Sequence, residues 1–262
     1  MSKTIKVVCV ILFAIAAVVL VVQYRNSRVV VVPEAAVREP RPPIEVLPIM
    51  EEPTPVVEEP TAPPTEVVDP PTPQLLPRIV ALRETYENPD IVGFIEIPGT
   101  AIAYPVAQTG NNVFYLYHDL HWSPSNAGSI FLDYENDLYR LADDNTIIYG
   151  HNMRNGSMFH NIRFFHDEDF FRAHTYILLD TPYRETVWDI FAFFPTTIAF
   201  DYLITNFHQS RDAYYDFLME LQRRSRFETG MTLSAQDQIL ILSTCAAIGG
   251  DNRYVLVARL RV

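Results

Sequence analysis

Proline is distributed very unevenly along this chain, and the distribution limits what each part can fold into. Of the 20 prolines among 262 residues, 14 lie between Pro33 and Pro77. The same tract carries nine acidic residues against two basic ones and has no aromatic side chain, so it offers nothing to a core. We expect residues 33–77 to be a disordered Pro/Glu-rich linker that reaches up to about 140 Å, at about 3.1 Å per residue. The alternative, that the tract is itself a docking ligand, stays open.

An apolar segment precedes the linker. Residues 5–22 are interrupted only by Lys6, and this length of helix, at about 1.5 Å per residue, makes about 27 Å, close to the roughly 30 Å of a bilayer core. The triplet A-I-A at residues 14–16 resembles a signal-peptidase site, but it lies inside the apolar run. We therefore expect residues 1–32 to be a cytoplasmic tip and an uncleaved transmembrane signal anchor, with the remaining chain exported.

Residues 78–262 have the size and composition of one globular domain. They hold 23 acidic and 14 basic residues, a net charge of −9, and both lysines of the chain lie before them. We expect no basic face that could neutralise phosphates, so nucleic acid is not an expected partner.

Short runs of β-branched and aliphatic residues recur through this domain between turn residues. Eight strands are predicted, at residues 92–97, 102–106, 129–132, 146–149, 176–179, 186–194, 238–244 and 254–260. A short helix is predicted before them, at residues 79–87. Eight short strands with few helices predict a mainly β fold with helices (α+β), built as a closed or nearly closed barrel.

A longer helix is predicted in the connection between the sixth and seventh strands, at residues 211–227, with Ser210 as its N-cap. Four apolar residues follow one face of it at i, i+3, i+4 and i+7, namely Tyr214, Phe217, Leu218 and Leu221. Such a stripe is typical of packing against a core. The whole connection is over 40 residues long, and an ordered insertion of this length often forms the wall of a binding site.

A cysteine lies where the seventh predicted strand ends. The uninterrupted apolar run at residues 239–242 is typical of a strand buried on both faces, and it leads through Ser243 and Thr244 to Cys245. The other cysteine of the chain, Cys9, lies in the membrane segment. Cys245 is therefore an unpaired thiol in an exported domain, either a reactive group or a small buried hydrophobe.

Two further polar residues lie at strand ends. Beyond Cys245 the chain turns through residues 249–250 and enters the last strand at Arg253, a hairpin that would hold a thiol and a guanidinium side by side. His151 ends another apolar strand directly after Gly150, which we expect to let the backbone turn. The spacings of the seven histidines match no zinc-ligand signature, so no metal site is expected.

These strand-end motifs together resemble those of the sortase family, and within it those of class B. L-S-T-C is followed by an arginine eight residues after the cysteine, and Y-G-H-N-M-x-x-G-S-M-F lies upstream. The resemblance implies a sortase-type eight-stranded β-barrel with an N-terminal helix and a long helix before the cysteine strand. It also assigns the residues of the site, with Cys245, His151 and Arg253 as catalytic and Ser243, Thr244, Asn112 and Leu116 as substrate-binding.

The function that the resemblance implies is transpeptidation on the outer face of a Gram-positive cell. A single-pass protein of the cell membrane, with its catalytic domain extracellular, would cleave a C-terminal sorting signal of secreted proteins. It would then join the released acyl group to an amine of a peptidoglycan precursor or of a pilin.

The same chemistry follows from the three residue types. A thiolate at Cys245 would attack an amide carbonyl and form a thioester. The guanidinium of Arg253 would stabilise the oxyanion without losing its own proton. His151 would protonate the departing amine and deprotonate the incoming one, and no cofactor is needed. Two alternatives remain: a cysteine endopeptidase that uses the same residues with water as the acceptor, and a non-enzymatic wall-binding module.

Overall fold

The structure, a computed structural model, describes residues 73–197, 199–208, 210–245 and 252–261. The predicted anchor, nearly all of the predicted linker and the predicted glycine turn lie outside these residues. Within the described ranges, no helix is both long and apolar enough to cross a membrane. The division of the chain into anchor, linker and catalytic domain therefore stays a prediction.

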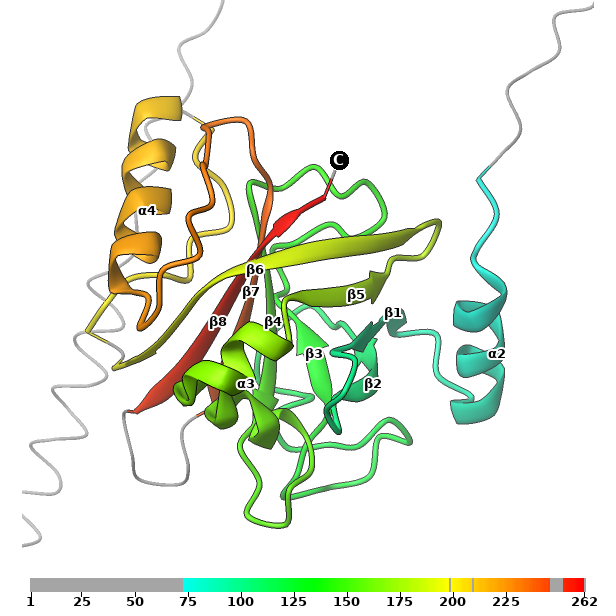
Figure 1. Cartoon of the computed structure of the whole chain (residues 1–262). Coiled ribbons are helices and arrows are strands. Elements are labelled where there is room, and N and C mark those ends of the chain that lie inside the picture. Colours follow the sequence, from blue (N-terminus) through cyan, green and yellow to red (C-terminus); the bar gives the residue numbers. More distant parts are fainter. Residues whose placement is uncertain (1–72, 198, 209, 246–251, 262) are drawn as a thin grey trace, which may run out of the picture. The chain divides into compact units, whose positions relative to one another are not determined.

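Eight strands close into a barrel in the order β1-β2-β3-β4-β7-β8-β6-β5 (Figure 1). The strands are β1 (Ile91–Glu96), β2 (Ala103–Ala107), β3 (Ile130–Leu132), β4 (Asn145–His151), β5 (Tyr176–Asp180), β6 (Glu185–Thr196), β7 (Ile239–Cys245) and β8 (Arg253–Leu260). Each predicted strand is present, and the ends differ from the predicted ones by at most two residues. The predicted barrel is confirmed.

Two neighbouring strand pairs in the barrel are parallel, β2 with β3 and β4 with β7, and the others are antiparallel. Parallel strands cannot be joined by a tight turn. The chain accordingly leaves β4, builds β5, β6 and a helix, and returns as β7. Because β4 and β7 run in the same direction, their last residues meet at the same edge of the barrel.

The apolar residues of β7 divide between two cores. Leu240 and Leu242 belong to a cluster with members on all eight strands, which fills the barrel interior. Ile239 and Ile241 belong to a second cluster, shared with the helix between β6 and β7, on the outer face. β7 is therefore buried on both faces, as its unbroken apolar run predicts.

The helix in that connection is α4 (Arg211–Arg224), and it ends three residues before the predicted position. Ser210 caps it, since its Oγ accepts a hydrogen bond from the Ala213 N–H at 3.1 Å. All four residues of the predicted apolar stripe are buried against the barrel. Figure 1 shows α4 alongside the barrel, on the side away from α2 (Pro77–Tyr86).

Shorter helical segments lie elsewhere. α2 begins at Pro77, two residues before the predicted helix, with proline in the first turn, where its missing N–H costs nothing. The 3-10 helix η1 (Phe159–His166) and α3 (Glu168–Ala173) follow β4 and lead to β5.

Candidate active site

The last residues of β4 and β7 bring two of the predicted catalytic residues together. The two strands pair in parallel from Asn145 with Ile239 to His151 with Cys245. The register thus places the backbones of His151 and Cys245 side by side at one edge of the barrel. The 93 residues between them in the sequence hide this neighbourhood, because spacing alone does not reveal which strands pair.

The third predicted catalytic residue opens the next strand. β8 begins at Arg253 and pairs antiparallel with β7, from Arg259 with Ile239 to Val255 with Ser243. Carried two residues further, the same register sets Arg253 opposite Cys245. The three predicted catalytic residues therefore occupy the ends of three adjacent strands, β4, β7 and β8.

His151 is half-buried and is oriented by a backbone group. Its Nε2 lies 2.9 Å from the carbonyl oxygen of Leu116. A carbonyl oxygen can only accept, so Nε2 carries the hydrogen of this bond. Sequence reasoning placed Leu116 against the substrate and missed this contact, because a backbone carbonyl leaves no trace in side-chain identity. The Leu116 side chain packs, partly buried, against a cluster with Tyr115 and Phe131.

Gly150, before His151, is required for packing. The expectation that it lets the backbone turn is wrong, because β4 continues through Gly150 to His151. A Cβ at this position would lie 2.4 Å from Cδ1 of Ile130 and 2.8 Å from the ring of Phe159. The glycine makes room for these two buried side chains and so lets β4 deliver His151 to the barrel edge.

Asn112, predicted to contact the substrate, joins the loop at residues 108–129 to the end of β3. Its Nδ2 donates to Oδ2 of Asp133 at 2.7 Å, and its Oδ1 accepts from the N–H of Tyr134 at 3.0 Å. The hydroxyl of Tyr149, two residues before His151, donates to the same Asp133 oxygen at 2.7 Å. The side-chain amide of Asn112 therefore fixes the loop that carries Leu116. That Asn112 contacts a substrate stays a prediction.

Ser243 and Thr244 are buried within the fold, with 1% and 2% of their surface exposed. The Ser243 hydroxyl lies 2.8 Å from the hydroxyl of Tyr202, which belongs to the connection before α4. The Thr244 hydroxyl accepts from the N–H of Tyr254 at 2.9 Å. Both hydroxyls thus form hydrogen bonds inside the fold. That these residues line a substrate groove stays a prediction.

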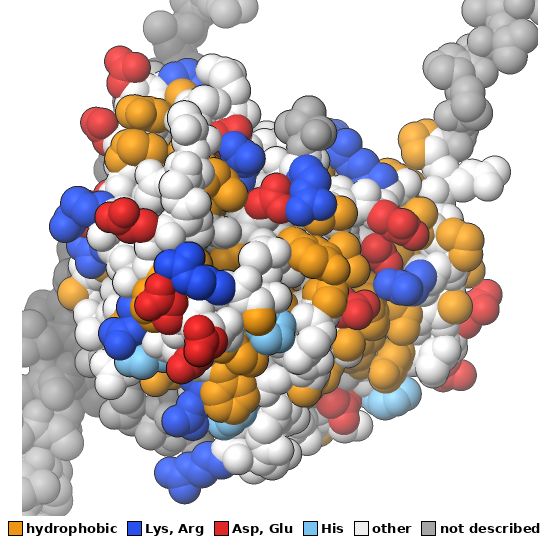
Figure 2. All heavy atoms as spheres, viewed as in Figure 1, with side chains coloured by type: hydrophobic (Ala, Val, Ile, Leu, Met, Phe, Trp, Pro, Cys, Tyr) orange, Lys and Arg blue, Asp and Glu red, His pale blue; other side chains and the backbone are white. Residues whose placement is uncertain are grey.

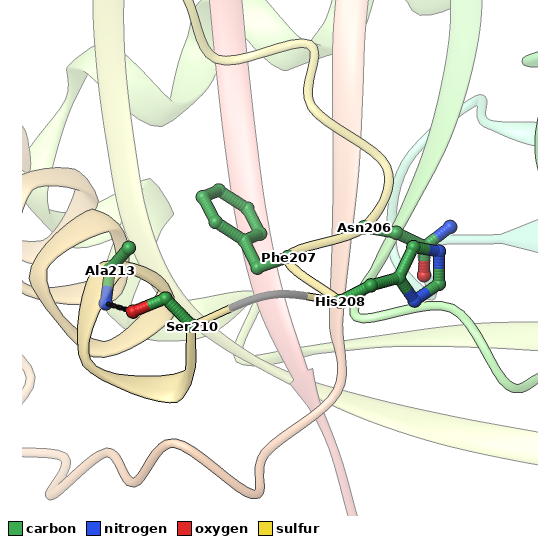
Figure 3. A pocket seen from close by; sticks show the side chains of 5 residues that line it. All are labelled: Asn206, Phe207, His208, Ser210 and Ala213. Carbon is green, nitrogen blue, oxygen red and sulfur yellow. Dashed lines mark hydrogen bonds between the residues drawn. The ribbon is translucent and has the colours of Figure 1, made fainter.

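A pocket of about 310 Å³ opens at the start of α4 (Figure 3). It is lined by Asn206, Phe207, His208, Ser210 and Ala213. The Phe207 N–H donates to Oδ2 of Asp144 at 2.7 Å, and Asp144 directly precedes β4. Six strand residues at about 3.3 Å each separate that end of β4 from His151 by about 20 Å. The pocket therefore lies away from the paired ends of β4 and β7.

The charged surface has no single sign on the face shown in Figure 2, where arginines lie among acidic side chains. In the described part of the chain, arginines pair with carboxylates, among them Arg78 with Asp180 and Arg211 with Asp144. Among the same residues, no group of three or more His, Cys, Asp or Glu side chains is arranged to hold a metal ion.

Comparison with known proteins identifies the family. A family model of the sortase domain matches residues 95–261. Sortase B of Listeria monocytogenes is 39% identical over 158 residues, which are 60% of this chain and 63% of that protein. Sortase B of Staphylococcus aureus is 34% identical over 175 residues, 66% of this chain and 71% of that protein. The chain thus spans a little under two thirds of the Listeria relative.

Solved structures of sortase B proteins are also similar to this chain. A Staphylococcus aureus sortase B–substrate complex superposes with a TM-score of 0.67 at 32% identity, covering 72% of this chain and 86% of that one. Sortase B of Clostridium perfringens gives a TM-score of 0.64 at 35% identity, covering 70% and 99%. The chain belongs to the sortase family, whose members are cysteine transpeptidases. These relatives are all sortase B proteins, so the likeness to class B is confirmed.

Proposed function

We propose that this protein is a membrane-anchored cysteine transpeptidase that cleaves a sorting signal near the C-terminus of secreted proteins and transfers the acyl group to an amine. The observation that supports this most is the pairing of His151 with Cys245 at the barrel edge, next to the strand that Arg253 opens. A nucleophile, a proton donor and acceptor, and a fixed cation are the groups that amide exchange requires.

In the first half-reaction, the Cys245 thiolate attacks the carbonyl carbon of the scissile amide. A C–S bond forms, and the carbonyl electrons move to the oxygen, where Arg253 stabilises the negative charge. The oxyanion then collapses and the C–N bond breaks. His151 gives its proton to the departing nitrogen, which leaves as an amine, and the acyl group remains on Cys245 as a thioester.

In the second half-reaction, the acceptor amine attacks the thioester carbonyl, and His151 takes a proton from the attacking nitrogen. The C–S bond breaks, the new amide is released, and Cys245 leaves as the thiolate that began the cycle. Because the same histidine gives and then takes one proton, the enzyme returns to its starting charge state.

The substrate class rests on the family. One solved relative is a sortase B–substrate complex, and we propose that the substrate of this chain is likewise a sorting peptide. We propose that Asn112 and Leu116 contact it from the loop at residues 108–129. Ser243 and Thr244, whose hydroxyls are bonded internally, would act by shaping β7 next to Cys245.

The predicted anchor at residues 5–22 would hold the protein in the cell membrane by a single pass, with the catalytic domain extracellular. There the domain would meet both exported donor proteins and the amines of a peptidoglycan precursor or of a pilin. Shortening the linker at residues 33–77 should leave peptide cleavage by the domain unchanged and reduce the attachment of donor proteins in cells. Equal loss in both assays would contradict the spacer role of the linker.

The test is mass spectrometry of a pool of sorting-signal peptides incubated with the wild type and with Cys245→Ala, with and without an added amine. We expect cleavage of one motif by the wild type, an amine adduct of its N-terminal part, and neither product with Cys245→Ala. Cleavage that yields only the acid at high amine concentration would support the endopeptidase alternative. Cleavage retained in Cys245→Ala would refute the mechanism.

A further inference from the structure

The group that orients His151 belongs to the loop between β2 and β3, at residues 108–129. The Leu116 carbonyl accepts the hydrogen bond from Nε2 of His151 at 2.9 Å. A catalytic histidine needs such an orienting partner, because the partner decides which ring nitrogen carries the hydrogen of the neutral ring. What holds this carbonyl in place therefore bears directly on the chemistry.

Gly128 lies directly against that carbonyl. A Cβ at position 128 would lie 2.6 Å from the oxygen of Leu116 and 2.6 Å from the oxygen of Tyr115, closer than real Cβ atoms come to other atoms. The residue also has a φ of +56°, in the left-handed region that favours glycine. Any other residue here must displace the Leu116 carbonyl or the strand that follows.

The loop has little freedom to yield, because Tyr115 is anchored. Its side chain is 1% exposed, and its hydroxyl donates to Oδ2 of Asp90 at 2.8 Å and accepts from Nδ2 of Asn88 at 2.9 Å. Its carbonyl accepts from the Ser129 N–H at 2.8 Å. Burial raises the pKa of Tyr115 to about 12, so the hydroxyl keeps its proton at any physiological pH.

We propose that Gly128 is a positioning residue for His151. It lets the Leu116 carbonyl reach Nε2, so that the neutral ring keeps its hydrogen on Nε2, and Nδ1 is the nitrogen that gives a proton to the departing amine and takes one from the incoming amine. Nε2 keeps its hydrogen through both steps. The proposal rests on the proposed function for the role of the ring, but the tautomer itself is independent of it.

Displacing the carbonyl removes the preference for one tautomer. A ring with its hydrogen on Nδ1 has no lone pair there and cannot accept the proton of the incoming amine. In a serine protease triad, the wrong histidine tautomer costs about 10⁴-fold in kcat, and a reacting group misplaced by about 1 Å costs about 10²-fold. For Gly128→Ala we expect kcat to fall about 10²-fold, since the substitution acts on proton transfer.

The matched control is Gly230→Ala. Gly230 also has a left-handed φ, +69°, and no atom lies within 4 Å of a Cβ built on it. Its substitution introduces the same kind of backbone strain without contact, and it lies between α4 and β7. We expect wild-type kcat and KM for this variant, with a small loss of thermal stability.

The decisive readout is the 15N NMR spectrum of the full chain, labelled with 15N-histidine and solubilised in detergent, at an alkaline pH where imidazoles are neutral. The comparison is made on a Cys245→Ala background, so that no thiolate keeps the ring charged, and His151 is assigned by the signals lost in His151→Gln. We expect the hydrogen on Nε2 with residue 128 unchanged and with Gly230→Ala. With Gly128→Ala we expect a large fraction of it on Nδ1.

Two results would overturn the proposal: hydrogen on Nδ1 when glycine is present at position 128, or an unchanged tautomer in Gly128→Ala. The first needs no substitution at residue 128, so the proposal stays testable even if Gly128→Ala does not fold. Peptide cleavage retained in Cys245→Ala would instead overturn the proposed function and leave the tautomer result standing.

Discussion

The two ends of the β4–β7 pair differ in how they are held. At the end where both strands begin, side chains from α4 form hydrogen bonds with the residues that precede β4 and β7. Both terminal nitrogens of Arg211 donate to the Asp144 carboxylate, at 2.7 and 2.6 Å. The hydroxyl of Tyr214 lies 2.8 Å from the Asp144 carbonyl oxygen and 2.7 Å from that of Asp237. This end is fixed by several strong contacts.

At the other end, where β4 and β7 finish, His151 is half-buried and bonds to a carbonyl of a separate loop. The residues that we propose to be catalytic lie at this end, where the register of β4 with β7 places His151 beside Cys245. If the proposed function holds, one end of this strand pair contributes stability and the opposite end carries the reactive groups. The comparison predicts that substitutions at one end change rate and that substitutions at the other change stability.

The largest effect is expected for His151→Ala, which removes the proposed proton donor and acceptor. We expect kcat/KM for peptide cleavage to fall about 10²- to 10⁴-fold, the usual contribution of general acid–base catalysis, with the melting temperature nearly unchanged. The control is His208→Ala, an exposed histidine near the Asp144 end. A loss of less than tenfold in His151→Ala, measured by the same peptide assay, would contradict the proposal that this end of the strand pair carries the reactive groups.

Arg253→Ala should come next, with a fall of about 10²- to 10³-fold in kcat, because one donor to a developing oxyanion is lost. Arg259 offers a matched control in the same strand, six residues further along β8, where its Nη1 donates to the carbonyl of Thr232 at 3.1 Å. Arg259→Ala should keep wild-type kcat and lose a little stability. Similar kcat values for the two variants would refute the oxyanion role of Arg253.

Tyr214→Phe tests the other end. Its hydroxyl meets two backbone carbonyls in a fully buried site, and its removal leaves them without that donor. We expect the free energy of unfolding to fall by about 1–3 kcal/mol in a urea titration, with kcat unchanged. Tyr215→Phe, on the exposed side of α4, should have no measurable effect. If Tyr214→Phe were as stable as the wild type, the hydrogen bonds of this hydroxyl would contribute little to the free energy of unfolding.

The smallest effect concerns the pH dependence of the Asp144–Arg211 pair. Burial alone would raise the pKa of Asp144, but hydrogen bonds from Arg211 and from the Phe207 N–H outweigh it and hold the pKa below its ordinary value of 3.8. A carboxyl whose pKa is lower in the folded state contributes stability above its unfolded pKa and loses it as pH falls through the folded value.

Melting temperatures of wild type and Asp144→Asn check this prediction. The wild type should be the more stable protein near neutral pH, and its advantage should shrink as the pH is lowered from about 6 to about 3. Because the pair is partly exposed, the effect is expected to be modest. An advantage that is constant over this range would show that the charge of Asp144 is not involved.

Much of the fold could be predicted from the sequence, because its signals are local. The apolar runs marked all eight strands, Ser210 marked the start of α4, and the apolar stripe of α4 marked its buried face. His151, Cys245 and Arg253 were singled out because each is a polar residue next to an apolar strand. The contact of the Leu116 carbonyl with His151 could not be predicted, because the groups come from distant segments and one of them is backbone.

The contacts of Gly150, Ser243 and Thr244 could not be predicted from the sequence either. Gly150 looked like a turn residue, since nothing local shows that Ile130 and Phe159 pack against it. Ser243 and Thr244 directly precede Cys245 in the sequence, and their hydroxyls bond to Tyr202 and to the Tyr254 backbone inside the fold. These contacts join residues that are far apart in the sequence, and such long-range packing leaves no pattern in a single sequence.

The central claim is that Cys245, paired with His151, carries the acyl group during transfer. The most direct measurement is mass spectrometry of the protein, quenched in acid during turnover of a sorting peptide without an acceptor amine, followed by peptide mapping. The account predicts an added mass equal to the N-terminal part of the cleaved peptide on the fragment that contains Cys245, removed by neutral hydroxylamine as a thioester is. Turnover with the acyl group on another residue, or with labelled solvent oxygen incorporated and no acyl-enzyme at any time, would contradict it.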